Sequence, residues 1–168
     1  LALKLSILLN MTLVRLPLLS KLGVINRQKQ RAAADEYMES ISIKAPSVQQ
    51  LVGNLSGGNQ QKVVVAKWLM MHPKVLIVDE PTRGIDVGSK SEIYGLLSDL
   101  AKQGMAIIVV SSEIEEIMGV CDSVVTISEG KKTAQLRITS ELTREQVLSC
   151  ALGSKPDWAG TGKEGDAT

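Results

Sequence analysis

Two short apolar runs, Val75–Val78 and Met105–Val110, dominate the hydrophobic pattern. Four consecutive branched apolar residues are too few for a helix and too continuous for a half-exposed strand, so the first run predicts a parallel strand covered on both faces. Between the runs, an amphipathic stripe follows helical spacing: Ile93, Leu96, Leu97 and Leu100. Ser89 and Glu92 predict a capping box at the start of this helix. Strand, helix and strand together predict a βαβ unit, and therefore an α/β fold with a parallel sheet.

Three further helices are predicted upstream. The first follows a leucine stripe and ends at Pro17, since proline cannot continue a helix. The stripe is Leu5, Leu8, Leu9, Leu13 and Leu16. Residues 1–19 are too polar and too short for a membrane span, although a membrane-surface helix stays open.

The second helix begins at its cap Asn26 and runs to about Ile41. Its expected inner face is Ala33, Tyr37, Met38 and Ile41. The third helix runs from about Gly57 to Met71 and is expected to bury Val64, Val65, Trp68 and Leu69.

Downstream of the second strand, the pattern predicts a hairpin and one more helix. The hairpin strands are residues 122–128 and 132–138, joined by a Glu-Gly-Lys turn. Thr143 and Gln146 form a capping box for a helix to about Leu152. We therefore divide the chain into a helical part (1–71), an α/β core (72–140), a C-terminal helix (141–152) and a tail (153–168) expected to be disordered.

Composition narrows the classes of function. A formal net charge of +1 with interspersed signs and four aromatic residues among 168 disfavours a nucleic-acid interface. Cys121 and Cys150 lack metal-ligand spacing and fit reduced thiols in the cytosol. His72 alone cannot build a metal site.

The first candidate chemistry lies at the predicted start of the third helix, in Leu55-Ser56-Gly57-Gly58-Asn59-Gln60-Gln61-Lys62. Unpaired N–H groups and the helix dipole attract anions there. Ser56 adds a hydroxyl, while Gly57 and Gly58 leave the backbone accessible to phosphate. An ordinary capped helix is the alternative.

The second candidate is the pair Asp79 and Glu80 at the end of the first predicted strand. Ligands of parallel sheets bind beyond the carboxyl ends of the strands, and alternation points neighbouring side chains apart. Asp79 would hold Mg²⁺ directly or through water, and Glu80 would polarise an attacking water. Two solvated acids are the alternative for such a pair alone.

Together, the Ser-Gly-Gly motif and the segment Val75-Leu76-Ile77-Val78-Asp79-Glu80-Pro81-Thr82-Arg83-Gly84-Ile85-Asp86-Val87-Gly88 resemble the ATP-binding cassette (ABC) family. More narrowly, the chain resembles the C-terminal part of the second cassette in bacterial monosaccharide importer ATPases of the ribose, galactose, arabinose or xylose type. The resemblance covers roughly residues 1–150. It implies a signature motif at residues 55–62, a Walker B strand at residues 75–80 and a D-loop at residues 84–86.

The resemblance also implies roles for individual residues. ATP and Mg²⁺ would be the ligands, with Glu80 catalytic and Asp79 on the metal. The implied nucleotide contacts are Ser56, Gly57, Gly58, Gln60, Asp86 and Ser112. Many ABC cassettes have histidine where Ser112 stands, so weaker transition-state stabilisation is expected. A capping box of Ser112 with Glu115 explains the serine equally well.

No P-loop motif is present in the 168 residues. Gly160-Thr161-Gly162-Lys163 resembles one, but Asp157 and Glu164 occupy the decisive positions and no strand precedes it. We expect this chain alone to bind ATP weakly and to be inactive, and we expect a sheet without its P-loop strand to expose an edge and an apolar face.

The partners that the resemblance implies are a second cassette, the membrane-spanning permease subunits and, indirectly, a periplasmic sugar-binding protein. The implied location is peripheral, on the cytoplasmic face of the bacterial inner membrane. Two alternatives to a sugar-importer ATPase remain: a truncated or degenerate cassette acting as a docking or regulatory module, and a non-transport ABC ATPase of translation or repair.

Overall fold

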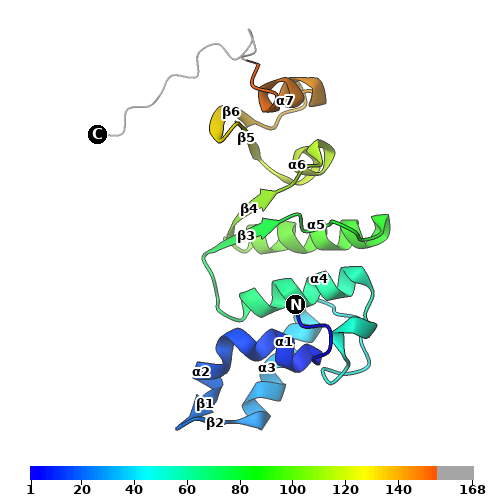
Figure 1. Ribbon diagram of the computed structural model, residues 1–168, viewed down its shortest axis with the longest axis vertical. Coiled ribbons are helices and arrows are strands. Elements are labelled where there is room, and N and C mark those ends of the chain that lie inside the picture. The colour runs from blue at the N-terminus through cyan, green and yellow to red at the C-terminus, as the bar shows by residue number, and fades with distance from the viewer. Residues whose placement is uncertain (155–168) are drawn as a thin grey trace, which may run out of the picture. The chain divides into compact units, whose positions relative to one another are not determined.

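A parallel βαβ unit is the part of the fold that carries the candidate carboxylates (Figure 1). In the computed structural model, β3 (Val75–Asp79) pairs in parallel with β4 (Ala106–Val110), and α5 (Val87–Lys102) connects them. The predicted strand, helix and strand are thus confirmed. The structure describes residues 1–154, so Gly160–Lys163 and most of the predicted tail (153–168) lie outside the described residues.

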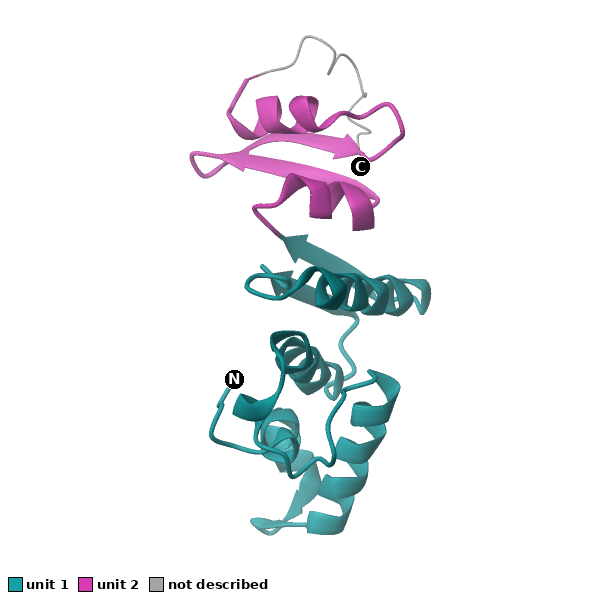
Figure 2. Cartoon of the chain, turned by 90° about the vertical axis from the view of Figure 1, so that its right-hand side faces the viewer, with its two compact units in different colours: residues 1–110 teal, residues 111–168 magenta. Residues whose placement is uncertain are grey.

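The chain folds into two compact units, residues 1–110 and residues 111–168 (Figure 2). The first unit also contains α1 (Ile7–Thr12), η1 (Leu13–Arg15), α2 (Leu16–Leu19), β1 (Ser20–Lys21), β2 (Val24–Ile25), α3 (Arg27–Ser40), η2 (Val52–Asn54) and α4 (Gly57–Leu69). The second contains α6 (Ile114–Val120), β5 (Ser123–Ser128), β6 (Lys131–Arg137) and α7 (Arg144–Ala151). The division predicted from the sequence stays a prediction.

One hydrophobic core runs through the first unit, joining the helices to the sheet. Its fully buried residues include Ile7 and Met11 of α1, Val63 of α4 and Ile93 of α5. Leu76 of β3 belongs to the same cluster. The core therefore fixes α4, α5 and β3 relative to one another, and these elements carry the first two candidate motifs.

Only one face of the two-stranded sheet is covered in the described residues. Leu76 is buried, whereas Val75 and Ile77 are 52% and 65% exposed. The prediction of a strand covered on both faces is wrong within the first unit, since the face that carries Val75 and Ile77 is largely exposed there. The exposed apolar face itself was expected for a sheet without a P-loop strand.

The first predicted helix is also corrected. Pro17 does not end it but lies in the first turn of α2, where a missing N–H costs nothing. The predicted leucine stripe is on the wrong side of α1: Leu5, Leu9 and Leu13 are largely exposed. The buried side of α1 is formed instead by Ile7, Asn10, Met11 and Thr12. No helix within residues 1–154 combines the length and apolarity needed to cross a membrane.

The second predicted helix is confirmed as α3, with Asn26 as its cap. The third is α4, which ends two residues early and leaves Trp68 49% exposed, so the prediction of Trp68 as a core residue is wrong. The Nζ of Lys67 lies 5.1 Å from the centre of the Trp68 ring, an attractive cation–π position at the surface.

The second unit matches its predicted elements closely. β5 and β6 form the antiparallel hairpin, and its turn places Glu129 and Gly130 at positive φ of 49° and 74°. These angles suit a two-residue turn whose twist matches the strands. The capping box of α7 is present: Thr143 accepts from the Gln146 backbone, and Gln146 accepts from the Thr143 backbone.

Candidate functional site around the start of α4

Ser56 begins α4 without capping it through its side chain. Its backbone is extended (φ −61°, ψ 156°), and its carbonyl accepts the first helical hydrogen bond from Gln60 N at 2.9 Å. Its hydroxyl oxygen instead accepts a 2.9 Å hydrogen bond from Asn59 Nδ2. Ser56 and Gly57 are exposed, so the start of α4 is open to a ligand.

Gly57 and Gly58 allow the start of α4 to approach the loop and helix that follow β3. A Cβ at Gly58 would lie 2.5 Å from Ser89 Cβ, and a Cβ at Gly57 would lie 3.0 Å from Ile85 Cγ2. Gly58 is itself buried. The glycines therefore serve helix packing, a reason that adds to the phosphate access inferred from the sequence.

Asp86 is the N-cap of α5 and lies beside this packing contact. Its Oδ1 accepts from Ser89 N at 2.9 Å and its Oδ2 from Ser89 Oγ at 2.7 Å. These hydrogen bonds lower the pKa of Asp86 below its usual value. The structure thus brings together the predicted site residues Ser56, Gly57, Gly58 and Asp86.

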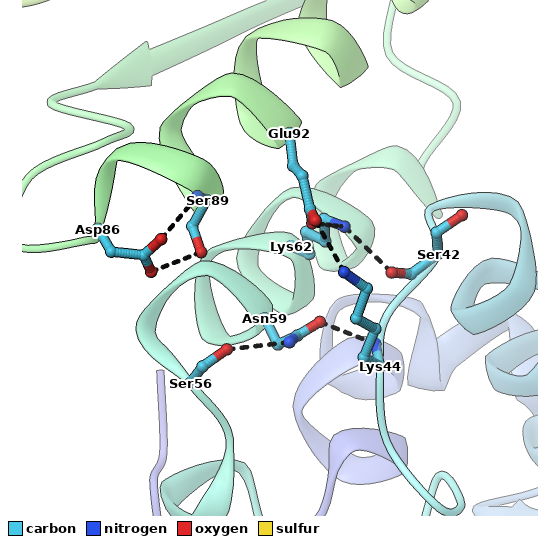
Figure 3. A network of polar contacts seen from close by, with 8 residues as sticks. All are labelled: Ser42, Lys44, Ser56, Asn59, Lys62, Asp86, Ser89 and Glu92. Carbon is cyan, nitrogen blue, oxygen red and sulfur yellow. Dashed lines mark hydrogen bonds and ion pairs between the residues drawn. The ribbon is translucent and has the colours of Figure 1, made fainter.

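Glu92 was predicted to close a capping box with Ser89, and that prediction is wrong. The Glu92 carboxylate instead accepts from Lys44 Nζ and Lys62 Nζ, each at 2.8 Å (Figure 3). Hydrogen bonds and charge attraction from these two lysines lower the pKa of Glu92 to about 2. Lys62 belongs to α4 and is only 4% exposed, and its Nζ also donates to the Ser42 carbonyl at 3.1 Å.

Gln60 was predicted to contact nucleotide, and its side chain turns back to its own helix start. Its Nε2 donates to the Leu55 carbonyl at 3.0 Å. This hydrogen bond holds Leu55, the residue before Ser56, against α4. The group of Gln60 that could contact a nucleotide is then its amide oxygen.

Asp79 and Glu80 lie at the carboxyl end of β3, as predicted. Asp79 is exposed, while Glu80 is half-buried and has a positive φ of 47°. The Glu80 N–H donates to the Val110 carbonyl at 2.8 Å, which continues the β3–β4 pairing by one residue. A non-glycine residue in this backbone region is strained, and such strain concentrates at functional sites.

The residues present fit a magnesium ion held together with phosphate. Mg²⁺ in nucleotide sites takes one or two carboxylates and completes its shell with phosphates and water. Asp79 supplies one exposed carboxylate. Within residues 1–154 no group of three or more His, Cys, Asp or Glu side chains could hold a metal without such a substrate.

Ser112 belongs to the second unit, so the structure does not place it relative to the other site residues. The predicted capping box of Ser112 with Glu115 is wrong, because Glu113 is the N-cap of α6. Ser111 makes two local hydrogen bonds: its Oγ accepts from Glu113 N at 3.0 Å and donates to Glu116 Oε2 at 3.2 Å.

Sequence reasoning missed Asn59 and the lysine–glutamate cluster behind it. Asn59 Oδ1 accepts from the Lys44 backbone N–H at 2.8 Å, so the loop before α4 is tied to its first turn. The available signal was Lys62, a charged residue on the face of a helix that the apolar spacing predicts to be buried. A buried lysine needs a partner that compensates its charge.

Known proteins similar to this chain include ATP-binding proteins of transporters. The family model described as ABC transporter matches residues 4–83. The xylose import ATP-binding protein XylG of Thermoanaerobacter pseudethanolicus is 49% identical over 146 residues, which are 87% of this chain and 29% of that protein. The ribose import ATP-binding protein RbsA of Clostridium perfringens is 45% identical over 145 residues, covering 86% of this chain and 29% of that protein.

Among solved structures, MJ1267, an ATP-binding cassette of an ABC transporter, superposes with a TM-score of 0.74. The match covers 90% of this chain and 64% of that one at 20% identity, so it bears on the fold alone. The chain spans less than a third of the length of the curated relatives named above. The motifs, the fold and these relatives together place the chain in the ABC transporter family of ATP-binding proteins.

Proposed function

We propose that this chain is part of the ATP-hydrolysing subunit of a sugar importer. The observation that carries the proposal is the open start of α4, where Ser56 and Gly57 are exposed and Asp86 is held close by. The relatives named for xylose and ribose import support a pentose or a similar monosaccharide as the cargo. They lend no support to a non-catalytic docking module.

The start of α4 would contact the terminal phosphate of ATP. The N–H groups of its first turn have no helical acceptor, and the helix dipole is positive there. Ser56 adds a hydroxyl on the exposed side, and Asp86 lies across the Gly58–Ser89 contact. Gln60 and, from the second unit, Ser112 are further proposed contacts.

Asp79 and Glu80 would act on a second nucleotide position at the end of β3. Asp79 would hold Mg²⁺, which neutralises phosphate charge when bound. Glu80 would accept a hydrogen bond from the attacking water and increase its nucleophilicity. The positive φ of Glu80 directs its side chain differently from that of an ordinary strand residue.

The 168 residues contain no P-loop, so both nucleotide positions need one from elsewhere. We propose that a partner cassette presents ATP to Ser56, and that an upstream P-loop of the same protein presents ATP to Asp79. Permease subunits and a periplasmic sugar-binding protein complete the system, with this subunit peripheral on the cytoplasmic face of the inner membrane.

The test is ATP hydrolysis by the complete ATP-binding protein in its transporter. Glu80→Gln should reduce turnover by at least about 100-fold while ATP still binds, since only the water-activating group is lost. Glu36→Gln, an exposed carboxylate of α3, is the matched control and should leave turnover unchanged. Turnover of Glu80→Gln equal to that of the control would overturn the proposed role.

ATP binding by calorimetry with Mg²⁺ gives a second test. A protein extended upstream through a P-loop should bind ATP, and the 168-residue chain should bind it weakly or not at all. Tight, stoichiometric binding by the 168-residue chain would contradict the proposed division of the site.

A further inference from the structure

The orientation of the Asn59 side-chain amide follows from its neighbours. The Lys44 backbone N–H, 2.8 Å from Asn59 Oδ1, can only donate. The oxygen of the amide must therefore face Lys44, and the NH₂ group must face Ser56, 2.9 Å away. The two contacts fix the amide, since exchanging its oxygen and nitrogen would set two donors against each other.

This orientation determines what the Ser56 hydroxyl can do. Because Ser56 Oγ accepts from Asn59 Nδ2, its own proton must point toward another acceptor. The N–H groups of the first turn of α4 are donors and cannot take that proton. The Ser56 hydroxyl and the N–H groups of the first turn therefore all present hydrogens at the exposed start of α4, an arrangement that favours an anion with several acceptor oxygens.

We propose that Asn59 is a positioning residue, which directs the Ser56 hydroxyl proton outward to a phosphate oxygen of ATP. This inference rests on the proposed function, in which Ser56 contacts the phosphate. Asn59 touches Ser56 and not the nucleotide, and it acts through the direction of one hydrogen bond.

The segment that anchors Asn59 is itself held from two sides (Figure 3). Lys44 Nζ pairs with Glu92 of α5 at 2.8 Å. Lys62 Nζ of α4 donates to the Ser42 carbonyl at 3.1 Å and pairs with the same Glu92 carboxylate. Residues 42–44 are thus fixed to both helices, and the Lys44 N–H keeps its direction toward Asn59.

Asn59→Asp tests the inference with little change of shape. A carboxylate still accepts from the Lys44 N–H, and a negative charge in the first turn of a helix is favourable, so the fold should persist. The carboxylate cannot donate to Ser56, however, and would accept its proton, which reverses the hydrogen bond. Gln61→Glu is the charge control, since it adds the same charge to the same turn without contacting Ser56.

ATP affinity is measured on the complete protein in its transporter, with Glu80→Gln in every sample so that ATP is not consumed. The expected result is that Asn59→Asp weakens ATP binding about 10- to 100-fold more than Gln61→Glu does, the range for one hydrogen bond to a charged group. In a Ser56→Ala background, the two substitutions should have the same effect.

Equal effects of Asn59→Asp and Gln61→Glu in the presence of Ser56 would overturn the inference. So would a greater effect of Asn59→Asp that persists in the Ser56→Ala background. If Ser56→Ala itself leaves ATP affinity unchanged, Ser56 does not contact the phosphate. That result would refute this part of the proposed function, whatever Asn59→Asp does.

Hydrogen exchange of the Lys44 amide supplies a readout independent of nucleotide. Asn59→Asp should keep this amide protected, because its acceptor is retained. Asn59→Ala should expose it to exchange. Loss of protection of the Lys44 amide in Asn59→Asp would show that the loop is displaced. The weaker ATP binding could then no longer be explained by the reversal of one hydrogen bond, and the inference would be overturned.

Discussion

Lys62 Nζ lies 2.8 Å from Glu92 Oε2, which joins the helix that follows the Ser-Gly-Gly motif to the helix that follows the Walker B strand. The lysine is nearly fully buried, whereas the glutamate side chain is partly exposed. Removing the partner of a buried charge costs far more than replacing the charge by an apolar group. The two members of the pair are therefore not equivalent under mutation.

We predict that Glu92→Gln destabilises the protein more than Lys62→Met does. Lys62→Met removes the buried charge and keeps the packing, so the free energy of unfolding should change by no more than about 1 kcal/mol. Glu92→Gln leaves the buried ammonium without its counter-charge. Urea denaturation of the three proteins gives the ranking, and a Lys62→Met variant less stable than Glu92→Gln would contradict it.

The same pair predicts a dependence of stability on pH. The pKa of Glu92 is lowered to about 2 in the folded state by Lys44 and Lys62, so its ionised form stabilises the fold. That stabilisation is present in full above the unfolded-state pKa of about 4.3 and is lost as the pH falls toward 2. Urea midpoints of the native protein and Glu92→Gln should differ at pH 7 and converge near pH 2.

Asp99 is the matched control for this experiment, since it lies on α5 and pairs with Lys102 at 3.1 Å on the exposed surface. Exposed pairs contribute little to stability. The urea midpoint of Asp99→Asn should therefore change with pH as that of the native protein does. A midpoint that instead matches that of Glu92→Gln at every pH would contradict the assignment of the pH dependence to Glu92.

Gly58 and Gly95 predict opposite results for one chemical change. A Cβ at Gly58 would lie 2.5 Å from Ser89 Cβ, so Gly58→Ala should destabilise the protein by about 1–3 kcal/mol through overpacking. Gly95, inside α5, has nothing within 4 Å of an added Cβ. Gly95→Ala should stabilise by about 0.5–1 kcal/mol through helix propensity. Thermal or urea unfolding measures both, and a shift of the same sign would contradict the close contact between α4 and α5.

The backbone strain at Glu80 can be separated from its side-chain contacts. Glu80→Gly and Glu80→Ala both remove the side chain, but only glycine adopts a φ of 47° without penalty. Glu80→Gly should be more stable than Glu80→Ala by about 1 kcal/mol. Equal denaturation midpoints would mean that the backbone at this position is unstrained.

Elements specified by local signals were predictable from the sequence. The β3–α5–β4 unit follows from two apolar runs around one amphipathic stripe, and the α7 capping box from Thr143 and Gln146. The start of α5 was not predictable in the same way, because Asp86 and Ser89 are both good capping residues. The choice depends on Glu92, whose partners Lys44 and Lys62 are 48 and 30 residues away in sequence.

The candidate site shows the same division. Ser56, Gly57, Gly58, Asp79, Glu80 and Asp86 were identified from their motifs. The position of Asn59 between Lys44 and Ser56 was not, since hydrogen-bond direction requires the loop to be placed in space. Trp68 was misassigned because α4 has apolar residues on more than one side, and only packing decides which of them is buried.

The loop between Glu80 and Asp86 has a mechanical consequence. Six residues can span at most about 20 Å, so only a short loop joins Glu80, the proposed catalytic carboxylate, to Asp86, the cap of α5. Thr82, near the middle of this loop, is almost fully buried and hydrogen-bonds to Tyr94 in α5 at 2.8 Å, which holds the loop against α5. A displacement at the end of β3 would therefore act on α5 through this short loop, and α5 carries Ser89, which lies directly against Gly58 of α4.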